Sequence, residues 1–213
     1  EKIIYLPNGV DFDRYLTLKE LPSPHLEVLE NLKSKFILVY TGAHGLANYL
    51  EAVVEIAKNI SEYDNNIHFV LIGDGPEKKS IIEKVKRDNI SNVTFLPPVQ
   101  KEYIPTVLSY ANAGIIAMRN AEVYRWGISL NKMYDYMAAG LPIVMLSNIK
   151  DTVITKNYLG IVTDNINDIT NEILNIKDNH ELLKRLSFNS YKYGKENHTW
   201  NKLAEKFEDN FKS

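Results

Sequence analysis

The sequence predicts an α/β fold, a parallel sheet of about six strands with helices on both faces. Two observations support this prediction. Short runs rich in valine and isoleucine alternate with longer segments of helical periodicity along nearly the whole chain. The runs are almost continuously apolar, which is typical of parallel strands buried on both faces. We therefore predict a doubly wound, Rossmann-like sheet.

The expected elements follow one another at regular spacing. We interpret residues 1–213 as a single domain, with a linker and entry segment at 1–35 and a C-terminal helix within 196–213. The runs FILVYTG, IHFVLIG, NVTFL, AGIIAM, PIVML and LGIVT predict the strands. Expected strands are 36–42, 67–73, 92–96, 113–118, 142–146 and 159–163, and expected helices are 46–60, 77–88, 101–110, 130–139, 167–176, 178–193 and 199–211.

Composition limits the classes of function. The chain has 213 residues and a formal net charge of −2, so its charge does not favour nucleic acid as a partner. It has no cysteine, which excludes disulfides, thiol nucleophiles and thiolate metal sites. No apolar run approaches the roughly 18 residues of a membrane-spanning helix, and no signal peptide is recognised. We expect a cytoplasmic protein and, because the first residue is Glu1, either a processed chain or a piece of a longer one.

Four loops are expected at one edge of the sheet. Ligands of open α/β sheets bind outside the carboxyl ends of the strands. This rule nominates the loops 41–45, 73–77, 97–100 and 119–132 as the walls of a cleft. The last of them is long, and long loops inside compact domains are more often functional than not. The sequence therefore predicts a ligand cleft before any motif is considered.

The segment GISLNKMYDYMAAGLPIV, residues 127–144, places a lysine where the helix dipole opposes a positive charge. Ser129 is expected as the N-cap, with Lys132 where a capping box has Glu or Gln. Free N–H groups at this helix start would suit a phosphate, and Asp135 is placed to accept from sugar hydroxyls. The alternative is a solvated helix face with a Lys132–Asp135 pair. The core-facing stripe is expected to comprise Leu130, Met133, Tyr134 and Met137.

Two glycine turns have both a structural and a functional interpretation. In GDGP, Gly73 and Gly75 resemble part of a dinucleotide fingerprint, but Lys79 takes the place of the third glycine. The alternative is a tight strand-to-helix turn with Pro76 at the helix start. The turn TGAHG allows backbone to approach a ligand closely. Its histidine, His44, is expected either to donate to a phosphate or carboxyl group or to be an ordinary surface residue.

No metal site is predicted. The DFD sequence at 11–13 has the form of an Asp-x-Asp metal motif, but we reject it because the linker is expected to lie far from the cleft loops. The histidines show no metal-ligand spacing. Tyr124 and Trp126 are expected either to stack on a base or sugar or to anchor their loop.

Five stretches occur in a recognisable order: YLPNGVDFDRY, YTGAHGLANYLEAV, FVLIGDGPEKKSI, NVTFLPPVQKEYIPTVLSYANAGII and SLNKMYDYMAAGLPIV. This ordered set resembles the C-terminal, nucleotide-sugar-binding half of family 4 (group 1) glycosyltransferases, which have a two-domain GT-B fold. Thr-Trp at 199–200 is similar to the C-terminal end of that family. The resemblance covers nearly the whole chain and implies that the chain is one half of a GT-B fold.

The resemblance also implies roles for particular residues. Asp135 falls on the second acid of the family's Glu-x7-Glu motif, which is expected to hold the ribose hydroxyls. Gly127 falls on the first acid, which is therefore absent, and Glu122 is out of register. SLNK is similar to the Ser-Pro-Asn-Lys of a bacterial subset, with Leu130 replacing proline, and implies that Lys132 meets the donor diphosphate. The implied catalytic residues are Lys132 and Asp135, and the implied donor-binding residues are Gly42, His44, Gly45, Gly73, Asp74, Gly75, Pro98, Val99, Gly127, Ser129 and Asn131.

The function implied by the resemblance is transfer of a sugar from a nucleotide-diphosphate sugar, UDP-linked, to a saccharide or lipid-linked acceptor. A missing N-terminal domain would bind the acceptor, so this chain alone is expected to be inactive. The resemblance also implies a role in bacterial surface-polysaccharide synthesis, at the inner face of the membrane. No cofactor or metal is expected. Alternatives are half of a GT-B-type sugar-nucleotide epimerase or a non-catalytic nucleotide-binding module, which Gly127 in place of the acid would favour. An NAD-binding domain is disfavoured by the incomplete glycine fingerprint.

Overall fold

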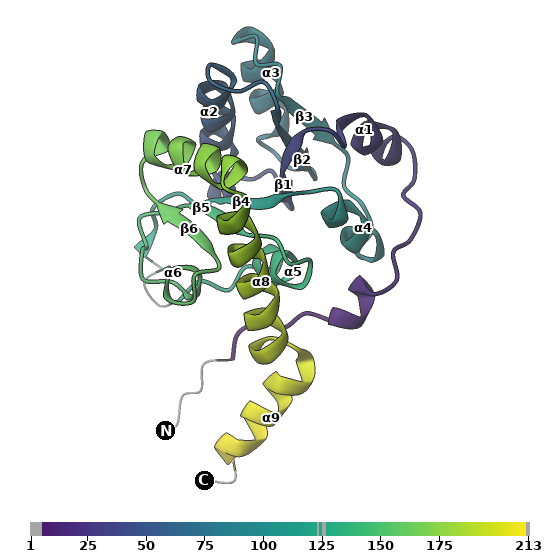
Figure 1. The fold of residues 1–213 in the computed structure, drawn as a ribbon, viewed down its shortest axis with the longest axis vertical. Coiled ribbons are helices and arrows are strands. Elements are labelled where there is room, and N and C mark those ends of the chain that lie inside the picture. The colour runs from purple at the N-terminus through teal and green to yellow at the C-terminus, as the bar shows by residue number, and fades with distance from the viewer. Residues whose placement is uncertain (1–5, 123, 125–126, 212–213) are drawn as a thin grey trace.

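The protein, in a computed structural model that describes residues 6–122, 124 and 127–211, contains a sheet of six parallel strands. The strand order is β3-β2-β1-β4-β5-β6, so the direction of winding reverses between β1 and β4 (Figure 1). The predicted α/β, Rossmann-like fold is therefore confirmed. The strands are β1 (Phe36–Thr41), β2 (Ile67–Ile72), β3 (Val93–Leu96), β4 (Ala113–Ala117), β5 (Ile143–Leu146) and β6 (Gly160–Thr163).

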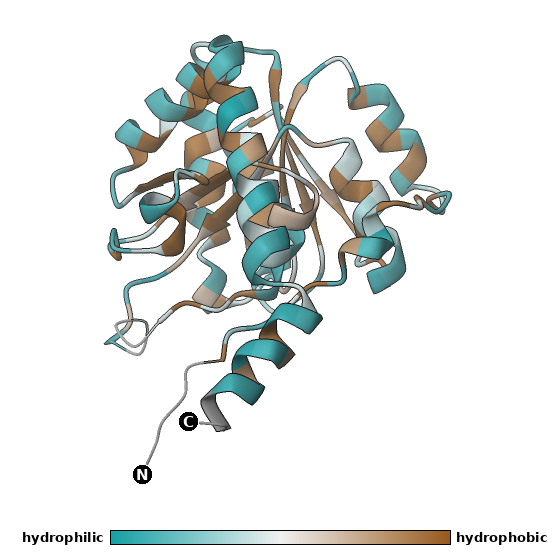
Figure 2. Ribbon diagram, turned by 60° about the horizontal axis from the view of Figure 1, so that its bottom comes forward, coloured by the Kyte–Doolittle hydropathy of each residue, from teal (hydrophilic) through white to brown (hydrophobic). Residues whose placement is uncertain are grey.

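Helices cover both faces of the sheet. Alternate residues of a strand point to opposite faces, so in β1 Leu38 and Tyr40 join one core cluster while Ile37 and Val39 join the other. Apolar segments accordingly lie between the layers in Figure 2, with hydrophilic stretches outside. The first face is covered by α2 (Leu50–Ser61), α3 (Lys78–Arg87) and α7 (Ile166–Asp178), and the second by α1 (His25–Leu32), α4 (Ile104–Ser109), α5 (Asn131–Ala138) and α6 (Val153–Lys156).

Two further helices follow the sheet. The first, α8 (His180–Asn197), packs along α5, and Gly194 permits the close approach because a Cβ there would lie 2.7 Å from Met137 Cβ. The second, α9 (Trp200–Phe211), extends away from the body of the domain (Figure 1). None of the helices in the described residues is long and apolar enough to cross a membrane.

The helix predicted at 46–60 begins later than expected. Residues Leu46–Asn48 form a 3₁₀ turn, η2, and Tyr49 then adopts a left-handed conformation with φ 43° and ψ 43°. A left-handed residue breaks the hydrogen-bond ladder of a right-handed helix, so α2 starts only at Leu50. The break leaves Asn48 on a turn at the edge of the sheet.

The segment expected to be a linker is part of the domain over its described residues. It contains the 3₁₀ turn η1 (Phe12–Tyr15) as well as α1. Its side chains Phe12, Leu21 and Leu29 are buried in the core. Burial of several apolar side chains stabilises their positions by roughly 1.5–3 kcal/mol each, so this segment is held against the sheet.

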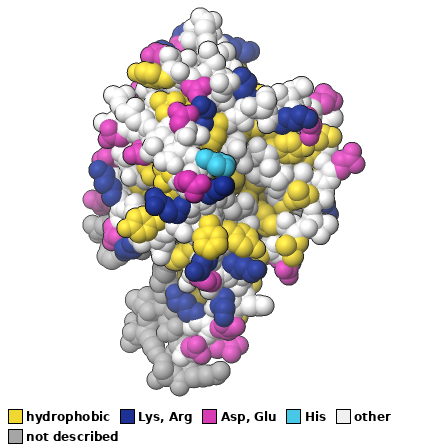
Figure 3. Space-filling view, viewed as in Figure 1, with side chains coloured by type: hydrophobic (Ala, Val, Ile, Leu, Met, Phe, Trp, Pro, Cys, Tyr) yellow, Lys and Arg dark blue, Asp and Glu magenta, His cyan; other side chains and the backbone are white. Residues whose placement is uncertain are grey.

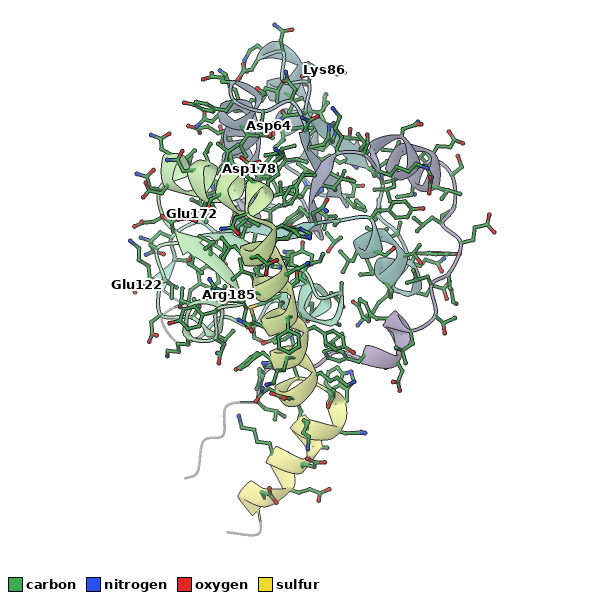
Figure 4. The ribbon with its side chains drawn as sticks, in the orientation of Figure 1. Asp64, Lys86, Glu122, Glu172, Asp178 and Arg185 are labelled. Atoms are coloured by element: carbon green, nitrogen blue, oxygen red, sulfur yellow. The ribbon has the colours of Figure 1, made fainter. Side chains whose placement is uncertain are left out.

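Charged side chains of both signs are interspersed on the face of the molecule seen in Figure 3. On the face that carries α8, basic and acidic groups alternate instead of gathering by sign (Figure 3). At the far end of α7, Lys177 Nζ lies 2.6 Å from Asp64 and 2.8 Å from Asp178. Asp64 and Asp178 are labelled in Figure 4. The contact with Asp64 joins α7 to the turn before β2, whereas Asp178 is the last residue of α7 itself.

The turns after β1 and β2 are joined backbone to backbone. The His44 N–H donates to the Asp74 carbonyl oxygen at 2.8 Å. A Cβ at Gly75 would lie 2.5 Å from the His44 carbonyl oxygen, and one at Gly73 would collide with the backbone of Gly42. Both glycines also have positive φ, at +146° and +157°. The glycines of GDGP therefore serve the packing of two turns. The strand-to-helix turn of the structural interpretation is present, but α3 begins at Lys78, so Pro76 is not at the helix start.

We expect Gly75→Ala to lower the free energy of unfolding by about 1–3 kcal/mol, because the new methyl group must displace backbone that has little room to move. Urea denaturation of both proteins measures the difference. Gly45→Ala is the control in the neighbouring turn. Gly45 has φ −112°, and the nearest atom to an added Cβ is 3.9 Å away. Equal losses in the two variants would contradict the backbone-to-backbone explanation.

Candidate functional site

A cavity of about 590 Å³ opens at the carboxyl ends of β1, β2 and β3, beside the N-terminus of α5. It lies at the point where the strand order reverses, which is the usual ligand site of open α/β sheets. Its volume is in the range of small-molecule pockets. The residues that line it are Thr41, Gly42, Ala43, Asn48, Ile72, Gly73, Asp74, Pro98, Val99, Lys101, Ile104, Leu130, Asn131, Lys132 and Asp135.

The orientation of α5 is set by Tyr136. Pairing between β1 and β4 stops after Val39, so the strands diverge below the cavity. The Tyr136 hydroxyl fills this gap, because it donates to the Val39 carbonyl oxygen at 3.2 Å and accepts from the Thr41 N–H at 3.2 Å. Gly114 in β4 leaves the space for the tyrosine ring. Tyr136, which the predicted core stripe omitted, is completely buried.

Lys132 presents its ammonium group to the cavity. Its Nζ donates to Asn48 Oδ1 at 3.1 Å and lies 4.6 Å from the centre of the Tyr40 ring. A Cβ at Gly42 would lie only 3.1 Å from Lys132 Cε, so glycine there makes room for the lysine stem. Burial lowers the pKa of Lys132 from 10.5 to about 8. No carboxylate among the described residues forms an ion pair with this ammonium group.

The first turn of α5 has no side-chain cap. The N-cap is Leu130, with extended backbone at φ −97° and ψ 127°. The prediction of Ser129 as the cap is therefore wrong by one residue. The Ser129 hydroxyl instead accepts from the Asn8 N–H at 3.1 Å and lies 3.1 Å from the Tyr134 hydroxyl. The Met133 N–H donates to the Leu130 carbonyl oxygen at 3.0 Å, whereas no described side chain caps the N–H groups of Asn131 and Lys132, which remain for a ligand.

Asp135 lies one turn further along α5 and lines the same cavity. Its Oδ1 accepts a hydrogen bond from the Tyr15 hydroxyl at 3.0 Å. Burial raises the pKa of Asp135, while the Tyr15 hydrogen bond and the charges of Lys101 and Arg14 oppose that change. The described structure shows no ion pair between Asp135 and Lys132, so the solvated Lys–Asp pair of the alternative interpretation is not formed.

His44 does not face the cavity, which corrects both expectations for it. Its side chain is completely buried, and its ring packs against those of Tyr40 and Phe95 with centroids 5.9 and 6.2 Å away. Both ring nitrogens are buried, and neither has a hydrogen-bond partner among the described residues. Burial lowers the pKa of His44 to about 4. A neutral, enclosed imidazole is neither a surface residue nor a direct contact for a phosphate.

Four more residues of the predicted set lie outside the cavity lining. Gly45 and Gly75 belong to the joined turns, and the Ser129 hydroxyl is bonded to the N-terminal segment. Gly127 lines a separate cavity of about 250 Å³ at the end of β5, together with Tyr124. None of these four positions forms the surface of the large cavity. The predicted residues that the structure brings together at the cleft are Gly42, Gly73, Asp74, Pro98, Val99, Asn131, Lys132 and Asp135.

Sequence reasoning missed Asn48, Lys101 and Tyr15. Asn48 was placed inside a helix that the left-handed Tyr49 interrupts. The rejection of DFD rested on a wrong distance, since Asp11 lines a small cavity that Asp135 and Lys101 also line. The stretch GAHGLAN, after β1, contains no Arg or Lys that could contact a phosphate. The amide side chain at its end, Asn48, could therefore have been nominated from the sequence. Trp126 lies outside the described residues.

Residues 35–179 match the family described as glycosyl transferases group 1. The chain belongs to this family. The match includes all six strands and α5. No curated protein matches the chain.

Solved structures share the fold of this group 1 glycosyl transferase domain. A mutant of S. aureus TarM with Fondaparinux, alpha-GlcNAc-glycerol and UDP is 19% identical, with a TM-score of 0.74 over 100% of this chain and 40% of TarM. Anabaena HepE with UDP is 13% identical, with a TM-score of 0.77 over 97% of this chain and 56% of HepE. The C-terminal domain of the group 1 protein LpcC from Francisella tularensis is 15% identical, with a TM-score of 0.71 over 90% of this chain and 100% of that domain. The chain thus spans about half the length of TarM and HepE.

We expect the Lys132 ammonium group to lose its proton near pH 8, because burial lowers its pKa to about 8. The unfolded chain keeps that proton up to the ordinary value of 10.5, so the contribution of this group to the free energy of unfolding rises with pH between the two values. NMR titration of the lysine Cε signals measures the midpoint, with Lys132→Met to assign the signal. A midpoint at the ordinary lysine value would contradict the buried placement.

Proposed function

We propose that this domain is the donor-binding half of a glycosyltransferase that uses a UDP-sugar. The complete protein transfers a hexosyl or N-acetylaminosugar group to a saccharide or lipid-linked acceptor held by an N-terminal half. The observation that carries the proposal is the pair Lys132 and Asp135, one helical turn apart on one side of the cavity, beside the uncapped start of α5. A cation and a carboxylate at that spacing suit the diphosphate and the ribose of a single nucleotide.

The diphosphate is assigned to the end of the cavity formed by Gly42, Asn48 and Lys132. The ammonium group has a neutral amide as its partner, so a phosphate oxygen can replace that amide without breaking an ion pair. The free N–H groups of α5 add donors that favour an anion. When the acceptor hydroxyl forms its bond to the sugar C1, the bond from C1 to the β-phosphate oxygen breaks, its electron pair stays on UDP, and the hydroxyl proton passes to the departing phosphate or to water. Lys132 and these N–H groups stabilise the charge that develops there.

The nucleoside is assigned to the opposite end of the same cavity. Asp135 Oδ1 is engaged by Tyr15, and among the described residues no donor bonds the other carboxylate oxygen. That oxygen is available to accept from the ribose hydroxyls. The apolar side chains of the cavity lining suit the flat face of a base. They include Ile72, Pro98, Val99 and Ile104.

The comparisons support the choice of nucleotide. HepE has been solved with UDP and with UDP-glucose, and TarM with UDP. WaaG, whose structure also matches, is a glycosyltransferase involved in lipopolysaccharide biosynthesis. From this likeness we propose that the complete protein has a role in bacterial surface-polysaccharide synthesis. The proposal also includes membership of family 4 and peripheral attachment to the inner face of the membrane.

Lys132→Ala is expected to weaken binding of UDP roughly 10- to 150-fold while changing uridine binding little, since one charge-assisted contact to the diphosphate is lost. Asp135→Asn is expected to weaken UDP and uridine to a similar degree, because both carry the ribose. Isothermal titration calorimetry measures the affinities. Lys84→Ala removes another partly buried lysine, on α3 away from the cavity, and is the control. Parental affinity for UDP in both site variants would overturn the proposal.

UDP is expected to bind equally well in EDTA and in magnesium or manganese. Two carboxylates, Asp74 and Asp135, line the cavity, and each already accepts a hydrogen bond, from the Gly75 N–H and from the Tyr15 hydroxyl. The positive charge is instead assigned to Lys132 and the start of α5. Calorimetry of one protein preparation under the three conditions is the test. Binding that appears only with a divalent ion would show that the phosphate assignment is wrong.

A further inference from the structure

A phenol and a carboxylate from residues 120 positions apart in the chain meet behind the cleft. The Tyr15 hydroxyl donates to Asp135 Oδ1 at 3.0 Å. Asp135 lines both the large cavity and a small one of about 30 Å³, whereas Tyr15 lines the small one and is absent from the lining of the large one. The carboxylate therefore stands between the two cavities, and Tyr15 reaches it from the side opposite the cleft.

Tyr15 is held in place by the turn to which it belongs. The Asp11 side chain accepts from the Asp13 N–H and pairs with Arg14 at 3.1 Å, which closes η1 on itself. Phe12 anchors the turn in the core, and its ring meets the edge of the Tyr191 ring at 5.6 Å between centroids. A donor fixed in this way constrains the rotamer of its acceptor.

The same N-terminal segment holds the start of α5. The Asn8 side chain donates from Nδ2 to Asn131 Oδ1 at 2.7 Å, and the Asn8 N–H donates to the Ser129 hydroxyl at 3.1 Å. Between these contacts and Tyr15, the Val10 N–H donates to the His198 carbonyl oxygen at 2.8 Å. Residues 8–15 thus contact both ends of the α5 surface that carries the cleft residues.

We propose that Tyr15 is a positioning residue that holds the Asp135 carboxylate with its second oxygen toward the ribose hydroxyls of the bound nucleotide. The inference rests on the proposed function, because it assigns the ribose to Asp135. A carboxylate free to rotate presents either oxygen in many directions, whereas one bound at Oδ1 presents Oδ2 in a single direction. Tyr15 therefore contributes to nucleotide affinity without touching the nucleotide.

The hydrogen bond also favours the charged carboxylate. Burial raises the pKa of Asp135, and the bond from Tyr15 is the first of the effects that lower it again. Without the Tyr15 hydroxyl, less opposes the effect of burial, so the pKa of Asp135 rises. On acidification, the Asp135 carboxylate then becomes protonated at a higher pH. The titratable or charged groups around this carboxylate are Asp11, Arg14 and Tyr15 from the N-terminal segment, Lys101 from η3 (Lys101–Tyr103), and Lys132 and Tyr136 on α5.

Tyr15→Phe removes the hydroxyl and keeps the ring. We expect it to weaken UDP and uridine alike by roughly 3- to 10-fold, about the net effect of one ordinary hydrogen bond, because Tyr15 does not touch the nucleotide itself. Tyr110→Phe is the matched control, because the Tyr110 hydroxyl donates to Glu30 Oε1 at 2.6 Å in another tyrosine–carboxylate pair that lies outside the cavity. Calorimetry gives the affinities, and thermal denaturation shows whether each variant is folded.

Three readouts separate positioning from a general structural role. Tyr15→Phe should leave the affinity for 2′,3′-dideoxyuridine diphosphate unchanged, since that probe lacks the hydroxyls that Asp135 would bind. In the Asp135→Asn background the same substitution should have no further effect on UDP. The pH at which UDP affinity falls on acidification should move upward in Tyr15→Phe and stay at the parental value in Tyr110→Phe.

Each contrary result has a definite meaning. Parental UDP affinity in Tyr15→Phe, with Asp135→Asn still impaired, would overturn this inference and leave the proposed function standing. An equal loss for UDP and the dideoxy probe would overturn it as well, because the effect would then not pass through the ribose. A parent chain that binds no UDP would overturn the proposed function and this inference together.

Discussion

The divergence of β1 and β4 is the constraint on which the rest of the site depends. Parallel strands that separate leave backbone groups without partners, and each such buried group costs about 1–3 kcal/mol if nothing bonds it. The Tyr136 hydroxyl bonds both the Val39 carbonyl oxygen and the Thr41 N–H, and Gly114 makes room for its ring. Because Tyr136 can meet these groups in only one rotation of α5, Lys132, one turn earlier on the same side of the helix, is turned toward the opening.

That rotation places two charged groups in a region with little solvent. Lys132 is half-buried with a neutral amide and an aromatic ring as its partners, and burial lowers its pKa to about 8. Asp135 is half-buried with a phenol as its hydrogen-bond donor. Half-buried charges without opposite partners are unfavourable in a free protein and are concentrated at ligand sites. Their arrangement is explained by a ligand that carries a diphosphate at one end and hydroxyls at the other.

The N-terminal segment has a larger part in the site than its position in the chain suggests. Its turn η1 supplies Tyr15, and Asn8 bonds two residues at the start of α5. The turns after β1 and β2 form the opposite wall, where glycines allow backbone groups to bond directly. The cleft is therefore bounded by segments from distant parts of the sequence, each held by hydrogen bonds to its neighbour. Rigid walls of this kind favour binding of a preorganised shape.

The sequence by itself determined the sheet, the order of its elements and the location of the cleft. Apolar runs such as FILVYT and IHFVLI report burial on both faces directly, and the carboxyl ends of parallel strands must meet at one edge. It also placed Lys132 and Asp135 together at this cleft, because their spacing on one helix is a local property. The tertiary structure alone decided that His44 is buried between Tyr40 and Phe95, that Tyr49 delays α2 and exposes Asn48 to the cleft, and that Tyr15 meets Asp135. These features depend on contacts between residues far apart in the chain and on single backbone angles, neither of which leaves a periodic pattern in the sequence.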